Sequence, residues 1–310
     1  MDGIGKTLLF KAAADWSVAV VKFLVSKGAD VNAKDNQNFT PLHSAASNED
    51  VEVVKFLVSK GLDVNSDAGS GGCTPLLYAA GNKNIEVIKF LVSKGAKVCA
   101  ENLRDSPPFH FAVSHNKNVD VIKFLISQGA DVNAKKTYLG EAPLHYALGR
   151  DDDIEIVRLL VSHGADVNTK SNEDFTPLHR AVGGADVEMV EFLISKGADV
   201  NAKSKSLRFT PLHFAVERGG NVDVIKFLIA NGADIHAKNT HGWTPLHAAA
   251  MRTDPKFAAT LVSLGADVHV ENNDGLHSCV TWHYGALHIL KSSNFSFPRV
   301  PMLIPKTTGA

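Results

Sequence analysis

The chain has 310 residues, of which 45% are hydrophobic, enough to form a substantial core and to exclude a disordered protein. Lysine and arginine together number 32 against 33 aspartates and glutamates. The chain therefore lacks the broad positive charge of a protein that binds nucleic acid or an anionic membrane surface.

The cysteines and the lengths of the apolar runs exclude further classes of protein. Cys73, Cys99 and Cys279 are too widely spaced for a disulfide framework or a paired zinc motif. No basic-then-apolar leader opens the chain, and no apolar run approaches the roughly 18 to 20 residues of a membrane span. We expect a cytoplasmic protein that has no cofactor, no nucleic-acid partner and no inserted membrane segment.

The first segment, "MDGIGKT", ends in the Gly-Lys-Thr of a phosphate-binding loop. Such a loop needs a further glycine five residues before Gly5 and a strand that leads into it, and the sequence has neither. Thr7 instead lies 33 residues before Thr40, so the segment aligns with later copies of a repeat, with Gly5 matching Gly242. We therefore expect no nucleotide site here.

The string Thr-Pro-Leu-His recurs along the chain. Complete copies begin at Thr40, Thr176, Thr210 and Thr244, and weaker copies begin at Thr74, Pro107 and Ala142. A second string, close to Gly-Ala-Asp-Val-Asn, has its glycine at Gly28, Gly61, Gly95, Gly129, Gly164, Gly197, Gly232 and Gly265. These glycines lie 33 to 35 residues apart, a period typical of repeat architectures.

Each unit predicts two short antiparallel helices. The threonine of Thr-Pro-Leu-His suits a helix N-cap, and the proline suits the first helical position. A second polar cap precedes each later apolar run, at Ser17, Asp50, Asn84, Asn118, Asp153, Asp186, Asn221 and Asp254. The run "VEVVKFLVSKG" then has its apolar residues mainly on one face and ends on Gly61 as a C-cap. The polar stretch before the next threonine is long enough for an arm that turns back.

These motifs, with their 33-residue period, resemble those of the ankyrin repeat family. The resemblance covers eight full units and part of a ninth. It divides the chain into a repeat array at 1–277 and a degenerate last repeat with an irregular tail at 278–310. It implies an all-α fold, a curved solenoid of stacked helix–turn–helix units with protruding β-hairpin or loop fingers.

The histidines do not indicate metal binding or catalysis. Six share one repeat position, where a hydrogen bond to neighbouring backbone would tie one unit to the next: His43, His110, His145, His179, His213 and His247. His277, His283 and His288 lie near Cys279 without a zinc signature. The acidic run at 151–153 fits a solvated helix cap. No paired nucleophile is evident, so we expect a non-enzymatic protein without catalytic or metal sites.

The family resemblance implies that a partner binds in a concave groove lined by the arms and the first helices. We call each Thr-Pro-Leu-His string a box. The residue before each box would face this groove, and most of these residues are aromatic: Phe39, Phe175, Phe209 and Trp243. Such rings are either partner anchors or rings that pack on the adjacent arm. The position after the box histidine is expected to be a partly buried stripe, with Tyr78, Phe111, Tyr146 and Phe214.

Basic residues near these rings are candidates for polar specificity. The loop after the first helix carries Arg150, Arg218 and Arg252, and a later arm carries Lys203, Lys205 and Arg208. A basic rim beside aromatic rings suits a partner segment with acidic and apolar residues, although these charges also fit a plain solvated surface.

The expected function is that of a monomeric scaffold or adaptor that binds a protein partner across its concave groove. The alternative is a targeting segment of a larger toxin or host-directed effector. Residues 291–310 have no repeat character, and the sequence does not identify the partner.

Overall fold

The computed structural model describes residues 7–277 except 49, 70–71, 82–83, 100–107, 116–117, 136–138, 149–153, 185 and 253. These residues form sixteen helices and no strand. The helices are α1 (Leu8–Asp15), α2 (Val18–Ser26), α3 (Pro41–Ala46), α4 (Val51–Ser59), α5 (Pro75–Ala80), α6 (Ile85–Ser93), α7 (Pro108–His115), α8 (Val119–Ser127), α9 (Pro143–Tyr146), α10 (Ile154–Ser162), α11 (Pro177–Ala181), α12 (Val187–Ser195), α13 (Pro211–Glu217), α14 (Val222–Ala230), α15 (Pro245–Ala250) and α16 (Lys256–Ser263). The expectations for Arg150, Asp153 and the tail at 278–310 lie outside the described residues.

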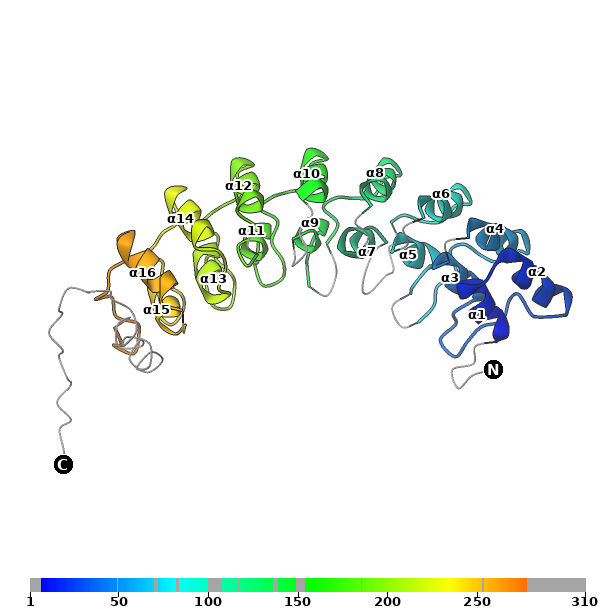
Figure 1. The fold of residues 1–310 in the computed structure, drawn as a ribbon, viewed down its shortest axis with the longest axis horizontal. Coiled ribbons are helices and arrows are strands. Elements are labelled where there is room, and N and C mark those ends of the chain that lie inside the picture. Colours follow the sequence, from blue (N-terminus) through cyan, green and yellow to red (C-terminus); the bar gives the residue numbers. More distant parts are fainter. Residues whose placement is uncertain are drawn as a thin grey trace, which may run out of the picture.

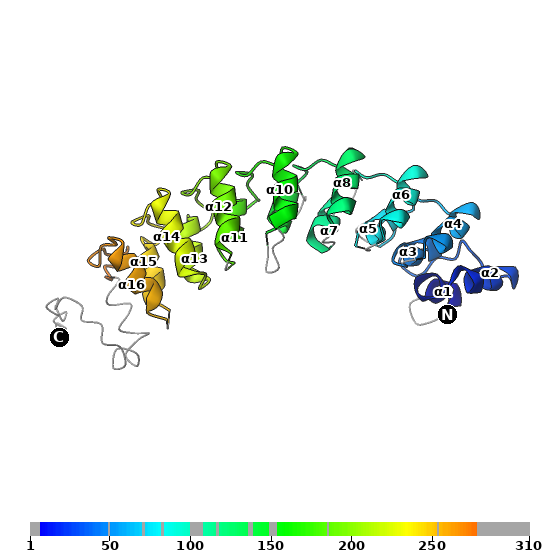
Figure 2. The same ribbon diagram turned by 45° about the horizontal axis from the view of Figure 1, so that its top comes forward.

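The helices form two rows along an arc. Figure 1 shows the odd-numbered helices along the inner side of the arc and the even-numbered helices along its outer side. Each inner helix packs against the outer helix that follows it and against the next inner helix, so neighbouring pairs stack (Figure 2). Buried side chains form one continuous core from Leu9 to Ala266. The fold is the expected all-α solenoid.

The outer helices follow from their caps and their apolar faces. In α12, the Asp186 side chain accepts a hydrogen bond from the N–H of Glu188 at 2.9 Å, and Leu193 is buried. The helix ends before Gly197, whose φ of 88° is a backbone conformation that favours glycine. Asp50, Asn84, Asn118 and Asn221 cap α4, α6, α8 and α14 in the same way. Their prediction as caps is confirmed.

One of the predicted caps, Ser17, differs from the prediction. Ser17 precedes α2, but its side chain forms no capping bond. The Asp50 carboxylate of the next unit accepts instead from the N–H of Val18 at 3.3 Å. At the other end of the array, Asp254 Oδ1 accepts from the N–H of Lys256 at 3.0 Å as the other caps do, although α16 begins only after Pro255. The difference at α2 arises because a neighbouring unit supplies the acceptor that Ser17 does not.

The inner helices are linked to the next unit through the box histidines. His179 Nδ1 accepts from the N–H of Thr176 at 3.1 Å, and His179 Nε2 donates to the Phe209 carbonyl at 3.1 Å. The same Nε2 atom reaches the next unit's backbone from His43, His110, His145, His213 and His247. The predicted role of these histidines is confirmed.

The fingers are the segments between each outer helix and the next inner helix. Asn168 Nδ2 donates to the Gly197 carbonyl at 2.8 Å, and Asn168 Oδ1 accepts from the N–H of Asp199 at 2.8 Å. Asn65, Asn133 and Asn201 bridge successive fingers in the same way. Among the described finger residues, β pairing is limited to isolated bridges at Ala68–Cys73 and Glu271–His277. The fingers are therefore loops rather than β-hairpins.

The first helix pair begins where the repeat alignment predicts. Thr7 is the N-cap of α1, and its carbonyl accepts from the N–H of Phe10 at 3.0 Å. Gly5 and Lys6 lie outside the described residues. Thr7 therefore opens a repeat helix, as its counterpart Thr40 does for α3.

Candidate functional site

The concave side of the array carries the residue at the base of each finger, directly before an inner helix. The residue that precedes it has a left-handed φ of between 54° and 75° at Asn38, Asp174, Arg208 and Gly242. A polar side chain earlier in the finger holds this turn, as Asn239 Oδ1 does by accepting from the N–H of Trp243 at 2.9 Å. Local backbone geometry therefore fixes the base residues Phe39, Phe175, Phe209 and Trp243.

Two of these rings meet on the concave side at α13. Phe214, on the first turn of α13, lies 5.2 Å from Phe175 and 5.7 Å from Phe209 between ring centroids, in edge-to-face geometry. We call Phe175, Phe209 and Phe214 the aromatic patch. Trp243, one finger further along, stacks on His247 at 6.4 Å. Phe39 lies in a separate group near the first units.

The rings of the patch pack on their neighbours and are also accessible. Phe175 and Phe209 pack against Phe214 on the inner helix α13, yet both side chains remain partly exposed. The residues directly after the box histidines are also partly buried. Tyr78, Phe111, Tyr146 and Phe214 are partly buried against the core, which confirms the predicted stripe.

Several predicted basic residues lie near the aromatic patch. Lys203, Lys205 and Arg208 are exposed on the finger that ends at Phe209. The Arg218 guanidinium lies 5.6 Å from the centre of the Phe214 ring and is itself exposed. A positive charge over an aromatic ring is favourable, and it leaves the donors of the guanidinium accessible. The patch is therefore bordered by positive charge.

Arg252 is placed differently from Arg218. Its guanidinium donates to the carbonyl of Glu217 in the preceding unit and lies 5.4 Å from the ring centre of Phe257. The side chain is only partly exposed. Arg252 therefore holds neighbouring units together, and this structural role is independent of any partner.

An ion pair replaces the aromatic contact in the middle of the array. The Arg180 guanidinium binds the carboxylate of Glu141, which is 4% exposed at the base of its finger. These two residues occupy the places that Phe175 and Phe214 occupy one unit later. Burial and the nearby Arg218 lower the pKa of Arg180. Along the array, this charge pair therefore lies between the rings of Phe39 and Tyr78 and the aromatic patch.

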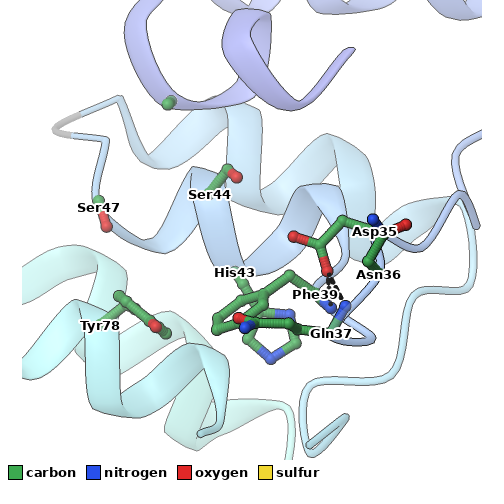
Figure 3. A pocket seen from close by; sticks show the side chains of 9 residues that line it. Asp35, Asn36, Gln37, Phe39, His43, Ser44, Ser47 and Tyr78 are labelled. Atoms are coloured by element: carbon green, nitrogen blue, oxygen red, sulfur yellow. Dashed lines mark hydrogen bonds between the residues drawn. The ribbon is translucent and has the colours of Figure 1, made fainter. Parts of the chain in front are cut away.

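A pocket of about 630 Å³ opens between the first inner helices (Figure 3). It lies among α1, α3, α5 and the finger before α3, and its lining includes Asp35, Phe39, His43, Ser44, Ser47 and Tyr78. The rings of Phe39 and Tyr78 meet edge-to-face at 5.8 Å. Asp35 Oδ1 accepts from the N–H groups of Gln37 and Phe39, at 2.9 Å each.

Sequence reasoning identified Phe39 but missed the pocket around it. Asp35 lies five residues before the box threonine, where Ser171 and Asn239 stand in later fingers. An acidic residue at this turn-holding position was the available signal. Tyr78 was assigned to the stripe between units, and its contact with Phe39 across two units was not predicted.

Five of the six box histidines are neutral parts of the scaffold: His43, His145, His179, His213 and His247. Burial is the main cause that lowers the pKa of His179 and of His213 to about 4. Burial also lowers the pKa of His43, His145 and His247. In these five histidines Nδ1 accepts a bond within the unit while Nε2 donates to the next unit, so neither ring nitrogen is left for a reaction or a metal ion.

Within the described residues, no helix is both long and apolar enough to cross a membrane, and no group of three histidine, cysteine or acidic side chains could hold a metal ion. A family model for ankyrin repeats matches residues 9–102, 109–204 and 201–272. A comparison with curated proteins gave no match.

Proposed function

The chain belongs to the ankyrin-repeat family, and we propose that it is a scaffold or adaptor that binds a protein partner across its concave side. Ankyrin repeats are generally non-catalytic modules for protein–protein interaction. The aromatic patch carries the proposal, because its rings are fixed by the fingers and by α13 yet remain partly exposed. Rigid aromatic side chains of this kind are frequent anchors of protein interfaces.

The charge around the patch suggests the chemistry of the partner. Lys203, Lys205, Arg208 and Arg218 would attract a segment with acidic side chains, while the rings would contact its apolar side chains. Trp243 extends this surface by one finger, and Phe39 provides a second contact near the first units. Arg150 is retained as a candidate on sequence grounds.

The proposed functional unit is the array as a monomer. It comprises eight full repeats and part of a ninth over residues 1–277, followed by a degenerate repeat and tail at 278–310. The chain mass is 33.2 kDa, so light scattering should return this value for the protein in solution. A mass of twice this value would contradict the monomer. Nothing in the fold or the comparisons favours the alternative of a toxin or effector segment.

Capture of partners from lysate of the source cell tests the proposed surface. The test variant carries Phe175→Ala, Phe209→Ala and Trp243→Ala. The matched control carries Phe90→Ala, Phe192→Ala and Phe227→Ala, three phenylalanines of the outer helices that are also partly exposed. Circular dichroism and melting must first establish that both variants fold like the parent.

We expect a specific partner that the parent and the control retain and that the test variant loses. Loss of the partner from the control alone would move the interaction to the convex side. Retention by both variants would exclude the aromatic residues as anchors and contradict the proposed site.

A further inference from the structure

Asp35 carries a charge that its finger does not need. In later fingers the turn before the inner helix is held by neutral side chains, those of Ser171, Ser204, Asn239 and Asn272. Asn239 Oδ1 accepts from two N–H groups, at 2.8 and 2.9 Å, and Asp35 Oδ1 does the same. An asparagine at position 35 would therefore hold the turn equally well, and the negative charge has no role in the turn.

The second carboxylate oxygen of Asp35 is directed into the pocket. Asp35 is only 8% exposed, and Figure 3 shows this oxygen pointing away from the turn, toward Ser44. Within the part of the chain that the structure describes, no side chain forms an ion pair with Asp35. A nearly buried carboxylate without an opposite charge is unfavourable unless a cation approaches it.

The rest of the pocket lining favours the same kind of ligand. Phe39 and Tyr78 contribute aromatic rings, and Ser44 and Ser47 contribute hydroxyl groups that can accept hydrogen bonds. His43 stays uncharged, because its Nδ1 accepts from the N–H of Thr40 while its Nε2 donates to the Cys73 carbonyl. None of the lining residues carries a positive charge.

We propose that this pocket binds a basic side chain, arginine or lysine, of the protein partner. The cation pairs with the free oxygen of Asp35, and the aliphatic stem packs against Phe39 and Tyr78. A volume of about 630 Å³ is ample for one such side chain. The inference rests on the proposed function, because it assumes that the partner lies along the concave side. The partner segment would then carry a basic residue for this pocket, in addition to the acidic residues that face the aromatic patch.

The probe is the short peptide acetyl-Gly-Arg-Gly-amide, titrated into the full chain and followed by NMR. A lysine peptide tests the alternative cation. A citrulline peptide is the control, since citrulline has nearly the shape of arginine without its charge. A single side chain should bind with a dissociation constant on the order of millimolar. The signals that shift should come from residues of the pocket, such as Ala14 and Ser47.

Two variants isolate the charge. Asp35→Asn removes the charge but retains the oxygen that holds the turn, as Asn239 shows in this chain. Asp67→Asn removes an equivalent charge from the next finger, where the residue is exposed and does not line the pocket. We expect Asp35→Asn to weaken arginine or lysine binding at least tenfold at unchanged melting temperature, and Asp67→Asn to change it less than twofold.

Three results would overturn the inference: no saturable binding of either basic peptide, equal binding of the citrulline peptide, or equal weakening by both variants. These results are separable from a failure of the proposed function. If the basic peptides do not bind but the patch variant still loses its partner, only the pocket assignment fails. If the peptides bind as expected but the patch variant retains its partner, the proposed anchors fail instead.

Discussion

The box histidines make the stability of the array depend on pH. The pKa of His179 and His213 is about 4 in the folded chain, mainly because both are buried, whereas the ordinary pKa of histidine is 6.5. Asp199 and Asp234 partly oppose this lowering, and Lys203 adds to it near His213. The unfolded chain therefore binds more protons between pH 6.5 and 4, so stability should fall as the pH falls through this window.

Urea denaturation at pH 7.5 and at pH 5 measures this effect. Each of the two histidines should cost about 2 kcal/mol of unfolding free energy at pH 5 relative to pH 7.5. The variant His179→Gln removes one titrating group, so it should lose about 2 kcal/mol less than the parent over the same interval. An equal loss in parent and variant would show that His179 does not titrate on unfolding.

The box histidines and the pocket residue Asp35 differ in how far the sequence could predict them. The histidine bonds were predictable because six histidines share one place in the repeat, and a role common to all six must be structural. Asp35 was not singled out, because a polar residue in a finger is unremarkable until its surroundings are known. Tyr78 reaches it from the next unit, and only the stacking of units brings the two residues to one pocket.

At the scale of the secondary-structure elements, the stability of the outer helices depends on their N-caps. Asp186→Ala removes the acceptor for the N–H of Glu188 and should cost about 1 kcal/mol of unfolding free energy. Ser17→Ala is the matched control, because Ser17 occupies the same place before α2 but forms no capping bond. Urea denaturation at pH 7.5 should separate the two variants clearly. Equal effects would mean that the Asp186 bond contributes nothing beyond the local backbone preference.

The elements themselves were predicted more completely than their ends. Apolar periodicity and the recurring glycine predict each outer helix, because both are local properties of the sequence. The cap of α2 escaped prediction, since the Asp50 carboxylate that accepts from Val18 belongs to the next unit. The fingers were expected as hairpins or loops. They are loops because the backbone bonds within one finger close only a tight turn, as from the N–H of Ser171 to the Phe175 carbonyl. Asn168 and its counterparts bond instead to the neighbouring finger.

At the scale of the molecule, the stacking gives the concave surface its shape and its stability. Each helix pair contacts only the pairs beside it, yet the buried residues join into one core along the arc. The surface residues come from several units, so the spacing of Phe39, the aromatic patch and Trp243 depends on every interface between them. A destabilising substitution in one interior helix pair should therefore disturb the concave surface on both sides of that pair.

A cavity in the middle of the array tests this dependence. Leu160 in α10 and Leu261 in α16 are both fully buried, one in an interior pair and one in the last described pair. Either substitution to alanine should cost about 2–5 kcal/mol locally. Because stability in stacked repeats is the sum of units and their nearest-neighbour interfaces, Leu160→Ala should increase hydrogen exchange from α8 to α12, and Leu261→Ala only from α14 onward. A uniform increase along the chain in both variants would instead identify the array as one cooperative unit, in which the concave surface is lost or kept as a whole.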